Sequence, residues 1–416
     1  MRKSRFIRSA LAFVGITLLT LGSAQTSISY WTLFTGGDKQ FMDAMVERFM
    51  DENPGIVIEP LTTAWENFYD FLTTAMAGGN APDVAIIHMT AIPGFASMGT
   101  LHPLDAAISE LGLPADDFLP IPWQRSTFDG VQYAVPLDVH PLALFFNQEI
   151  LTGLGLLDDG GAFVQPTSRE GWLEVFRTIA AETDADPYPI ATLGAPIYRE
   201  WFSLLHQNGG QILSDDGTRA AFNSPAGLDA LQFWVDHIRT NAFSPEGLTF
   251  PQTFTMFQQG DSAIEGYGVW RTGAYEGVEG LEFGAGPYPV FGAEPAVWAN
   301  SHVFVLPTQR TRDPEKDRAA MQFIDWMTNN TLMWTRAGHV PPRQSVIESA
   351  EYQALPHRPF KEVAMLDAVR YPPLHVRLNE IEAAILEELQ AATGGAKSAE
   401  RALADAEQRV NAILAR

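Results

Sequence analysis

Cysteine is absent from all 416 residues of the chain. Without a thiol the protein forms no disulfide, has no thiol nucleophile and holds no thiolate-ligated metal. A lipid anchor attached to an N-terminal cysteine is excluded for the same reason, so we expect a protein that is not a lipoprotein.

Positive charge is also scarce. The chain has 27 Lys and Arg residues against 50 Asp and Glu residues, which gives a formal net charge of -23. Nucleic acids and anionic membrane surfaces repel such a chain. We therefore expect no nucleic-acid partner, and we attribute the acidity to solubility.

Long apolar runs are missing except at the N-terminus, where residues 10–21 form one. Small residues, Gly22-Ser23-Ala24, follow the run, and four basic residues precede it: Arg2, Lys3, Arg5 and Arg8. This pattern indicates a secretory signal peptide, because the run is too short to span a bilayer comfortably. We expect cleavage near Ala24, a mature chain of net charge -27 and a periplasmic location.

Metal-binding and nucleotide-binding motifs are missing as well. The nine histidines are scattered without a His-Glu-x-x-His spacing, and no Gly-x-x-x-x-Gly-Lys-Ser/Thr loop occurs. Asp215-Asp216 lies in a polar turn that we interpret as solvated. We expect no metal site and no cofactor, and any ATP hydrolysis belongs to a partner.

The stretch from Ile28 to His88 has the pattern of an α/β protein. It predicts strands ending at Trp31, Ile58 and His88, with two helices between them. The last strand is apolar on both faces, which is typical of a central strand in a parallel sheet. About 390 mature residues exceed one ordinary domain and predict two.

This stretch resembles extracellular solute-binding protein family 1, the maltose-binding-protein-like sugar-binding subunits of bacterial ABC importers. Later segments extend the resemblance, including two apparent interdomain crossovers. The residues that carry it are Trp31, Gly36-Gly37, Glu52-Asn53-Pro54-Gly55-Ile56, Trp65, Gly79-Asn80-Ala81-Pro82-Asp83-Val84, 130–147, 266–270, 297–306 and 338–343.

The resemblance implies a two-lobe periplasmic binding protein fold of type II, with discontinuous lobes joined by hinge crossovers. Residues 25–138 and 303–345 would form the N-terminal lobe. Residues 139–302 and 346–416 would form the C-terminal lobe. It also implies a non-enzymatic protein that carries a mono- or oligosaccharide to permease subunits, and we expect a monomer.

Aromatic residues at the ends of predicted elements are candidates to stack on a sugar ring. Trp65 follows the second predicted strand, Tyr267 and Trp270 lie beside glycines, and Trp298 precedes a crossover. Trp201 is ambiguous, because the helix predicted from Arg199 to Gln207 could end over the cleft. Tryptophans on predicted helical stripes are interpreted as core: Trp172, Trp234 and Trp326.

Polar candidates lie where the crossovers should meet the cleft. Asp138 is either a ligand carboxylate or a hinge hydrogen-bond acceptor, and His140 lies beside it. His88 ends a predicted strand, where it contacts a ligand or caps a loop. The other two candidates are Asn300 and Arg343, and Arg343 either binds a hydroxyl or phosphate or pairs with a surface carboxylate.

Two other functions remain open. The same fold can bind a glycerol phosphoester or another phosphorylated polyol, but that ligand needs a cationic anchor, and Arg343 is the main candidate. A secreted glycoside hydrolase would need two carboxyl groups facing each other across a cleft. Asp138 with Glu66 or Glu265 is the only pairing we identify.

Overall fold

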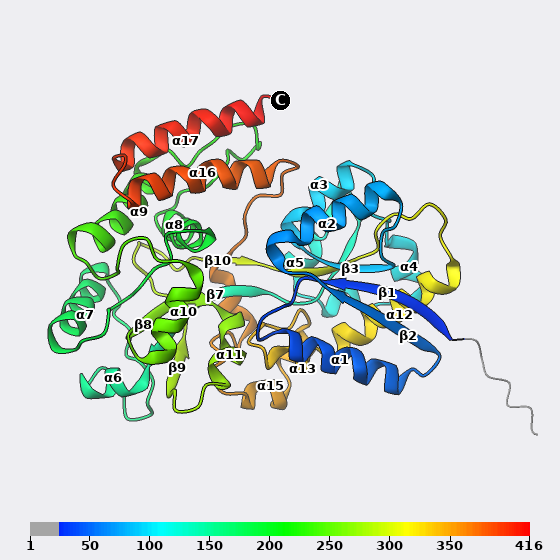
Figure 1. Ribbon diagram of the computed structural model, residues 1–416, viewed down its shortest axis with the longest axis horizontal. Coiled ribbons are helices and arrows are strands. Elements are labelled where there is room, and N and C mark those ends of the chain that lie inside the picture. Colours follow the sequence, from blue (N-terminus) through cyan, green and yellow to red (C-terminus); the bar gives the residue numbers. More distant parts are fainter. Residues whose placement is uncertain (1–24) are drawn as a thin grey trace, which may run out of the picture.

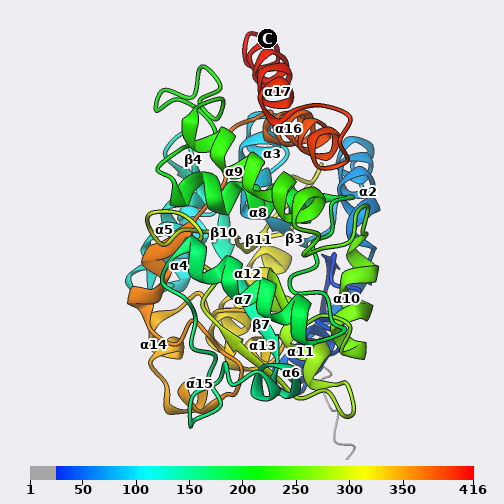
Figure 2. The same ribbon diagram turned by 90° about the vertical axis from the view of Figure 1, so that its left-hand side faces the viewer.

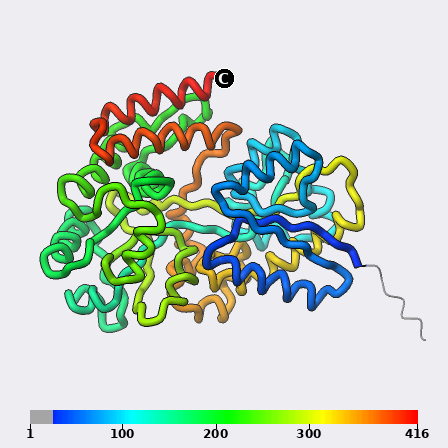
Figure 3. The backbone as a smooth tube through the Cα atoms, in the orientation of Figure 1, coloured from blue at the N-terminus to red at the C-terminus, as the bar shows by residue number. Residues whose placement is uncertain are grey.

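The protein consists of two lobes that lie side by side and are joined by chain segments running between them (Figure 1; Figure 3). The computed structural model describes residues 25–416, and the predicted signal peptide lies outside them. Each lobe has a sheet covered by helices, which confirms the α/β class and the two-lobe architecture.

The N-terminal lobe is built on a five-stranded sheet of order β2-β1-β3-β11-β6. Its first three strands are parallel, as the apolar pattern predicts, and β11 runs antiparallel to both neighbours. The strands are β1 (Thr26–Thr32), β2 (Ile56–Thr62), β3 (Val84–His88), β6 (Ala134–Pro136) and β11 (His302–Val305).

Helices cover this sheet because their apolar residues recur on one face. In α1 the buried residues are Met42, Met45, Val46 and Phe49, which are spaced at three and four positions. α2 ends at Gly79, whose positive φ of 73° suits a residue without Cβ. The helices are α1 (Lys39–Glu52), α2 (Trp65–Gly78), α3 (Ile92–Ser97), α4 (Asp105–Leu111), α5 (Pro120–Arg125), α12 (Pro314–Asn329) and α13 (Thr331–Thr335).

The C-terminal lobe has a second sheet centred on β7, every residue of which is buried. β8 and β9 pair with β7 in antiparallel register, and β10 pairs with the start of β7. The strands are β7 (His140–Asn147), β8 (Ile264–Gly268), β9 (Phe283–Gly286), β10 (Val297–Asn300) and β12 (Val369–Arg370).

Helices surround the second sheet, and side-chain caps fix where two of them begin. Ser168 and Ser224 accept hydrogen bonds from the backbone N–H groups of Gly171 and Gly227. α16 and α17 form a pair that packs against α8 and α9 (Figure 2). The helices are α6 (Gln148–Gly153), α7 (Arg169–Glu182), α8 (Ala195–Gln207), α9 (Pro225–Val235), α10 (Phe250–Gln259), α11 (Thr272–Glu276), α14 (Gln344–Ile347), α15 (Ala350–Ala354), α16 (Leu378–Thr393) and α17 (Ala399–Leu414).

The chain crosses between the lobes at several points. It leaves β6 for β7 through residues 137–139, and it returns from β10 to β11 through Ser301. A third crossing follows α13, because Ala337 belongs to the N-terminal core and Val340 to the C-terminal core. This change of core puts the third crossing earlier than the boundary at residue 345 drawn from the sequence.

Of the three stripe tryptophans, Trp172 and Trp234 are fully buried in the C-terminal core, as predicted. Trp326 is only partly buried, because its indole N–H donates to the exposed carboxylate of Glu52 over 2.8 Å. Within residues 25–416, no helix combines the length and the apolar character needed to span a membrane.

Candidate functional site

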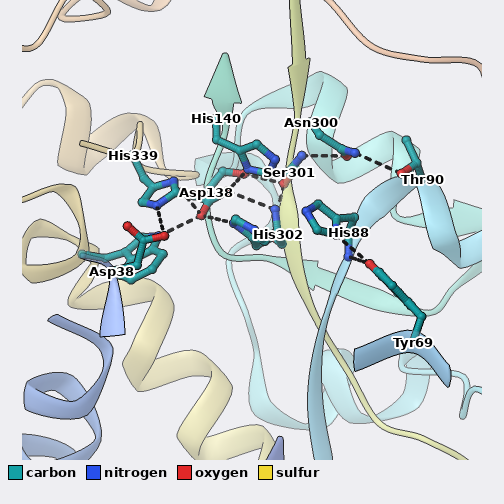
Figure 4. A network of polar contacts seen from close by, with 11 residues as sticks. Asp38, Tyr69, His88, Thr90, Asp138, His140, Asn300, Ser301, His302 and His339 are labelled. Carbon is teal, nitrogen blue, oxygen red and sulfur yellow. Dashed lines mark hydrogen bonds and ion pairs between the residues drawn. The ribbon is translucent and has the colours of Figure 1, made fainter. Parts of the chain in front are cut away.

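Asp138 is the centre of a polar network between the lobes (Figure 4). Its carboxylate is fully buried and lies on the first crossing. His140 Nδ1 lies 2.9 Å from Oδ1, and His302 Nδ1 lies 2.8 Å from Oδ2. The indole N–H of Trp334 donates to Oδ2 over 2.8 Å, and the backbone N–H of His302 donates to Oδ1 over 3.0 Å. In this structure Asp138 is therefore a hinge hydrogen-bond acceptor.

The network keeps the aspartate charged. Burial alone would raise the pKa of Asp138, but nearby His302 and His339 and the hydrogen bond from His140 hold it well below its usual range. Burial, together with the nearby charge of His302, lowers the pKa of His140 to about 3. Burial also lowers the pKa of His88 well below its usual range. His88 and His140 are thus neutral at neutral pH.

Two more candidates link the network to the N-terminal lobe. The Tyr69 hydroxyl accepts the backbone N–H of His88 over 2.9 Å and lies 2.6 Å from His88 Nδ1, so its own proton points to that nitrogen. Asn300 Nδ2 donates to the hydroxyl of Thr90 over 3.0 Å, and its Oδ1 accepts the backbone N–H of Ser301. Asn300 therefore connects the C-terminal sheet to the lobe opposite.

An aromatic wall continues from the network along the C-terminal lobe. We define it by Tyr267, Trp270 and Trp298, whose neighbouring ring centroids are 5.6 and 6.4 Å apart. The ring of His140 lies 5.6 Å from that of Trp270. A Cβ on Gly268 would lie 2.0 Å from the Trp270 indole, so only glycine lets this ring fold back over the strand.

Arg199 lies on the aromatic wall, and the sequence analysis missed it. Its guanidinium carbon is 4.5 Å from the ring centroid of Trp298 and 5.2 Å from that of Trp270. Burial lowers its pKa, an effect opposed by Tyr267 and Glu382. Among residues 25–416, no carboxylate oxygen lies within the 4.0 Å of an ion pair with this guanidinium. Arg199 is thus a partly buried cation with capacity for a ligand.

The sequence feature that could have identified Arg199 as a site residue was its position in a predicted helix. The sequence analysis began that helix at Arg199, whereas α8 begins at Ala195. The earlier start places Arg199 in the second turn, beside the wall. It also places Trp201 in the core, where its ring has no exposed surface and its indole N–H donates to the Gly227 carbonyl over 3.1 Å. This position corrects the expectation that Trp201 contacts a ligand.

Arg343 has a structural environment as well. Its side chain is buried, and its guanidinium lies 4.4 Å from the ring centroid of Phe118. It donates to Asp325 over 3.1 Å and to the Thr328 hydroxyl over 2.9 Å, and Asp117 lies 3.5 Å away. Arg343 therefore pairs with carboxylates of the N-terminal lobe, the second of the two roles considered for it, and offers no surface to a ligand.

The N-terminal lobe carries polar and aromatic side chains at the start of α2. Trp65 begins α2 and is 46% exposed, and the next turn of the helix carries Tyr69. A cavity of about 250 Å³ lies beside this turn, lined from both lobes. Its lining includes Tyr69, Asp70, Thr73, Thr90, His375 and Asn379.

The carboxyl pairs considered for a hydrolase are not arranged as free acid and base. Asp138 is enclosed by its donors, and Glu265 is buried 3.6 Å from Arg271 and accepts a hydrogen bond from Tyr275. Glu66 is exposed on α2. Asp138 and Glu265 are thus occupied by donors within the protein, whereas hydrolysis of a glycosidic bond requires two available carboxyl groups.

Another buried carboxyl group lies behind the wall. Glu200 accepts hydrogen bonds from Tyr188, over 3.3 Å, and from Tyr288. Burial raises its pKa to about 8, although both hydroxyls oppose the shift. Glu200 is therefore largely protonated at neutral pH, which leaves Arg199 uncompensated by its neighbour in sequence.

Comparisons with known proteins agree on one family. Residues 33–333 match the family described as bacterial extracellular solute-binding protein. The diacetylchitobiose binding protein DasA of Streptomyces coelicolor is 28% identical over 159 residues, which cover 38% of this chain and 35% of that protein. The sn-glycerol-3-phosphate-binding periplasmic protein UgpB of Escherichia coli is 22% identical, covering 100% of this chain and 98% of that protein.

Solved structures show the same fold. The cyclic alpha-maltosyl-1,6-maltose binding protein from Arthrobacter globiformis superposes with a TM-score of 0.77 and is 26% identical. The match covers 94% of this chain and 99% of that one. This agreement confirms the two-lobe fold predicted from the sequence.

We predict that Asp138→Asn destabilises the protein by about 3 kcal/mol or more, because the new amide opposes buried donors with a donor of its own. Urea denaturation measures the loss. Asp43→Asn is the control, since it removes an exposed ion pair with Lys39 and should cost about 0.5 kcal/mol at most. Similar losses in the two variants would contradict the central role of Asp138.

We also predict a pH dependence that Glu200→Gln removes. The folded state holds a proton on Glu200 up to a pKa of about 8, whereas the unfolded state releases it near 4.5. Stability contributed by this group is therefore fully present below pH 4.5 and is lost as pH rises through 8, at roughly 1.4 kcal/mol per pH unit within the window. Urea denaturation across this window should show a smaller loss for the variant. Equal slopes would show that Glu200 is ionised in the folded state.

Proposed function

The chain belongs to the bacterial extracellular solute-binding protein family, and we propose that it is the substrate-binding protein of an ABC importer. It binds a carbohydrate, either a mono- or an oligosaccharide, between its lobes and delivers it to the permease subunits in the membrane. The ligand is carried unchanged, and ATP hydrolysis belongs to the transporter.

The aromatic wall with its stacked arginine is the observation that carries this proposal. Sugar rings present C–H faces that stack on indoles, and their hydroxyls need paired donors and acceptors. The N–H groups of the Arg199 guanidinium supply hydrogen-bond donors for these hydroxyls. The indole N–H of Trp298 is buried and has no hydrogen-bond partner within residues 25–416, so it is a further donor for a sugar oxygen.

Contributions from both lobes make closure favourable. Trp270 and Arg199 lie on the C-terminal side, and Trp65, Tyr69 and Thr90 lie on the N-terminal side. A ligand that contacts both sides binds the closed state better than the open one, and that difference in affinity drives closure. We propose Trp65, His88, Tyr267, Trp270 and Trp298 as ligand contacts and add Arg199, with Asp138, His140 and Asn300 as hinge residues.

Membership in an extracellular family places the protein outside the cytoplasm. We propose that it diffuses in the periplasm as a monomer after cleavage near Ala24. The absence of cysteine supports a protein without a lipid anchor.

Arg199 also favours a second candidate ligand, a glycerol phosphoester. Arg343 is the main cationic anchor that the sequence suggests, but in the structure its guanidinium pairs with Asp325 and Asp117. Arg199 supplies the guanidinium that a phosphate needs, without a competing ion pair. The full-length likeness to an sn-glycerol-3-phosphate-binding protein agrees with this alternative.

Calorimetric titration with neutral disaccharides and with glycerol phosphates tests the function. A ligand present at about 100 times its dissociation constant also stabilises the folded state by about 2.7 kcal/mol, so a thermal-shift screen can precede it. Binding of neither class would contradict the proposal, and release of free sugar from a glycoside would show an enzyme instead.

We predict that Trp270→Ala weakens carbohydrate binding by about tenfold or more, because a stacking surface worth roughly 1.5–3 kcal/mol is lost. The dissociation constant from calorimetry measures the effect. Trp326→Ala is the matched control, since that indole lies beside Glu52 and should leave the affinity unchanged. An unchanged affinity in Trp270→Ala would place the sugar elsewhere.

We predict that Arg199 separates the two ligand classes. Arg199→Gln should weaken a phosphoester by about 10- to 100-fold, because a charge-assisted hydrogen bond contributes about 1.5–3 kcal/mol. Arg199→Lys keeps the charge and should retain more of that affinity. For a neutral sugar, both variants should lose similar affinity, and added salt should change little. A phosphoester that binds Arg199→Gln as well as wild type would remove Arg199 from the site.

A further inference from the structure

His339 is a buried side chain without a hydrogen-bond partner. Neither of its ring nitrogens is hydrogen-bonded within residues 25–416, and the residue has no exposed surface. Buried polar atoms in proteins nearly always have a partner, so this pair of nitrogens requires an explanation. The ring lies flat on Trp334, with centroids 4.4 Å apart and an interplanar angle of 5°, which fixes its direction.

The orientation of the His339 ring places its Nδ1 atom close to Asp138, the centre of the hinge network. That atom lies 3.3 Å from Asp138 Oδ2. The Nδ1 atoms of His140 and His302 approach the same carboxylate at 2.9 and 2.8 Å. Three imidazoles therefore present the equivalent nitrogen to one carboxylate (Figure 4).

These four side chains have the spacing of a metal site. One ligand atom from each of Asp138, His140, His302 and His339 lies within 4.8 Å of all the others. Tetrahedral zinc, with bonds of about 2.0–2.2 Å, holds its ligand atoms about 3.3–3.5 Å apart. The shortest contacts must lengthen by about half an ångström, and a contact at the 4.8 Å limit must shorten by about 1.3–1.5 Å.

We propose that Asp138, His140, His302 and His339 bind a divalent transition metal, with Zn²⁺ as the best match. Three imidazole nitrogens and one carboxylate oxygen form a four-ligand set that suits zinc, and the complete burial of the set is typical of a structural site. A histidine that binds the metal through Nδ1 carries its proton on Nε2, so that Nδ1 can donate its lone pair to the metal.

The surrounding residues provide the outer contacts of such a site. His339 Nε2 lies 3.5 Å from Oδ2 of Asp38, the carboxylate–histidine–metal arrangement that orients metal-binding histidines. Trp334 donates its indole N–H to Asp138, which holds the carboxylate in place. The metal would thus occupy a preformed environment.

The metal site goes beyond the proposed function, because its ligands connect the chain segments that cross between the lobes and do not contact a solute. Asp138 lies on the first crossing, and His140 begins β7 directly after it. His302 begins β11 directly after the return crossing, and His339 lies on the third crossing. A sequence search for close spacing finds no such site, since the ligands come from three distant segments. This is why we expected no metal from the sequence.

Zinc binding to tag-free protein, first stripped with a chelator, tests the proposal. Competition with a chromophoric chelator should show one tight site, and cobalt should give the intense visible bands of tetrahedral coordination. His339→Gln should abolish tight binding. Asp38→Asn, which leaves all four ligands in place, should weaken it by about 10- to 100-fold.

His102→Gln is the control, because this histidine of the N-terminal lobe lies outside the cluster and should leave zinc binding unchanged. Far-UV circular dichroism in chelator checks that each variant is folded. If His339→Gln does not fold, Asp38→Asn still tests the proposal. Zinc bound equally by wild type and Asp38→Asn, or octahedral cobalt spectra, would overturn the proposal and leave the cluster a hydrogen-bonded hinge. The outcome is independent of sugar binding, since these titrations contain no sugar.

Discussion

A single buried carboxylate determines how the lobes are joined. An ionised Asp138 in a dry environment would be very unfavourable unless donors surround it. Its donors come from His140 and His302, which follow the first and return crossings, and from Trp334 in α13. The charge therefore has its hydrogen-bond donors only when these segments meet in one arrangement. The need of this carboxylate for surrounding donors thus fixes how the hinge segments are arranged.

The aromatic wall adjoins that hinge, because the ring of His140 lies 5.6 Å from that of Trp270. Gly268 permits the Trp270 ring to lie over β8, and Gly266 leaves room for the Tyr188 hydroxyl, which a Cβ would meet at 1.6 Å. Behind the wall, Glu200 is largely neutral and Glu265 is paired with Arg271. Glu200 and Glu265 therefore do not neutralise Arg199.

Local patterns were sufficient to predict the α/β class, and the family resemblance implied the two-lobe fold. Long-range packing decided the positions of the side chains that were misplaced. Apolar periodicity identified α1 and the parallel strands, since both depend on neighbours in sequence. Trp201 and Arg199 are two residues apart on one helix, and only the packing of α8 decides which faces the core. Arg343 and His339 acquire their partners from segments far away in the chain. No spacing rule in the sequence reveals such contacts.

The net charge of the chain does not decide which ligand the cleft takes. A charge of -23 repels anions at a distance, yet at physiological ionic strength such fields decay within about 8 Å. Inside the site the nearest charges matter more, and there an unpaired guanidinium lies on two indoles. Burial raises the pKa of nearby Glu382 to about 7, so at neutral pH that carboxyl is only partly charged. Acidic composition is therefore compatible with either a neutral sugar or a phosphorylated polyol.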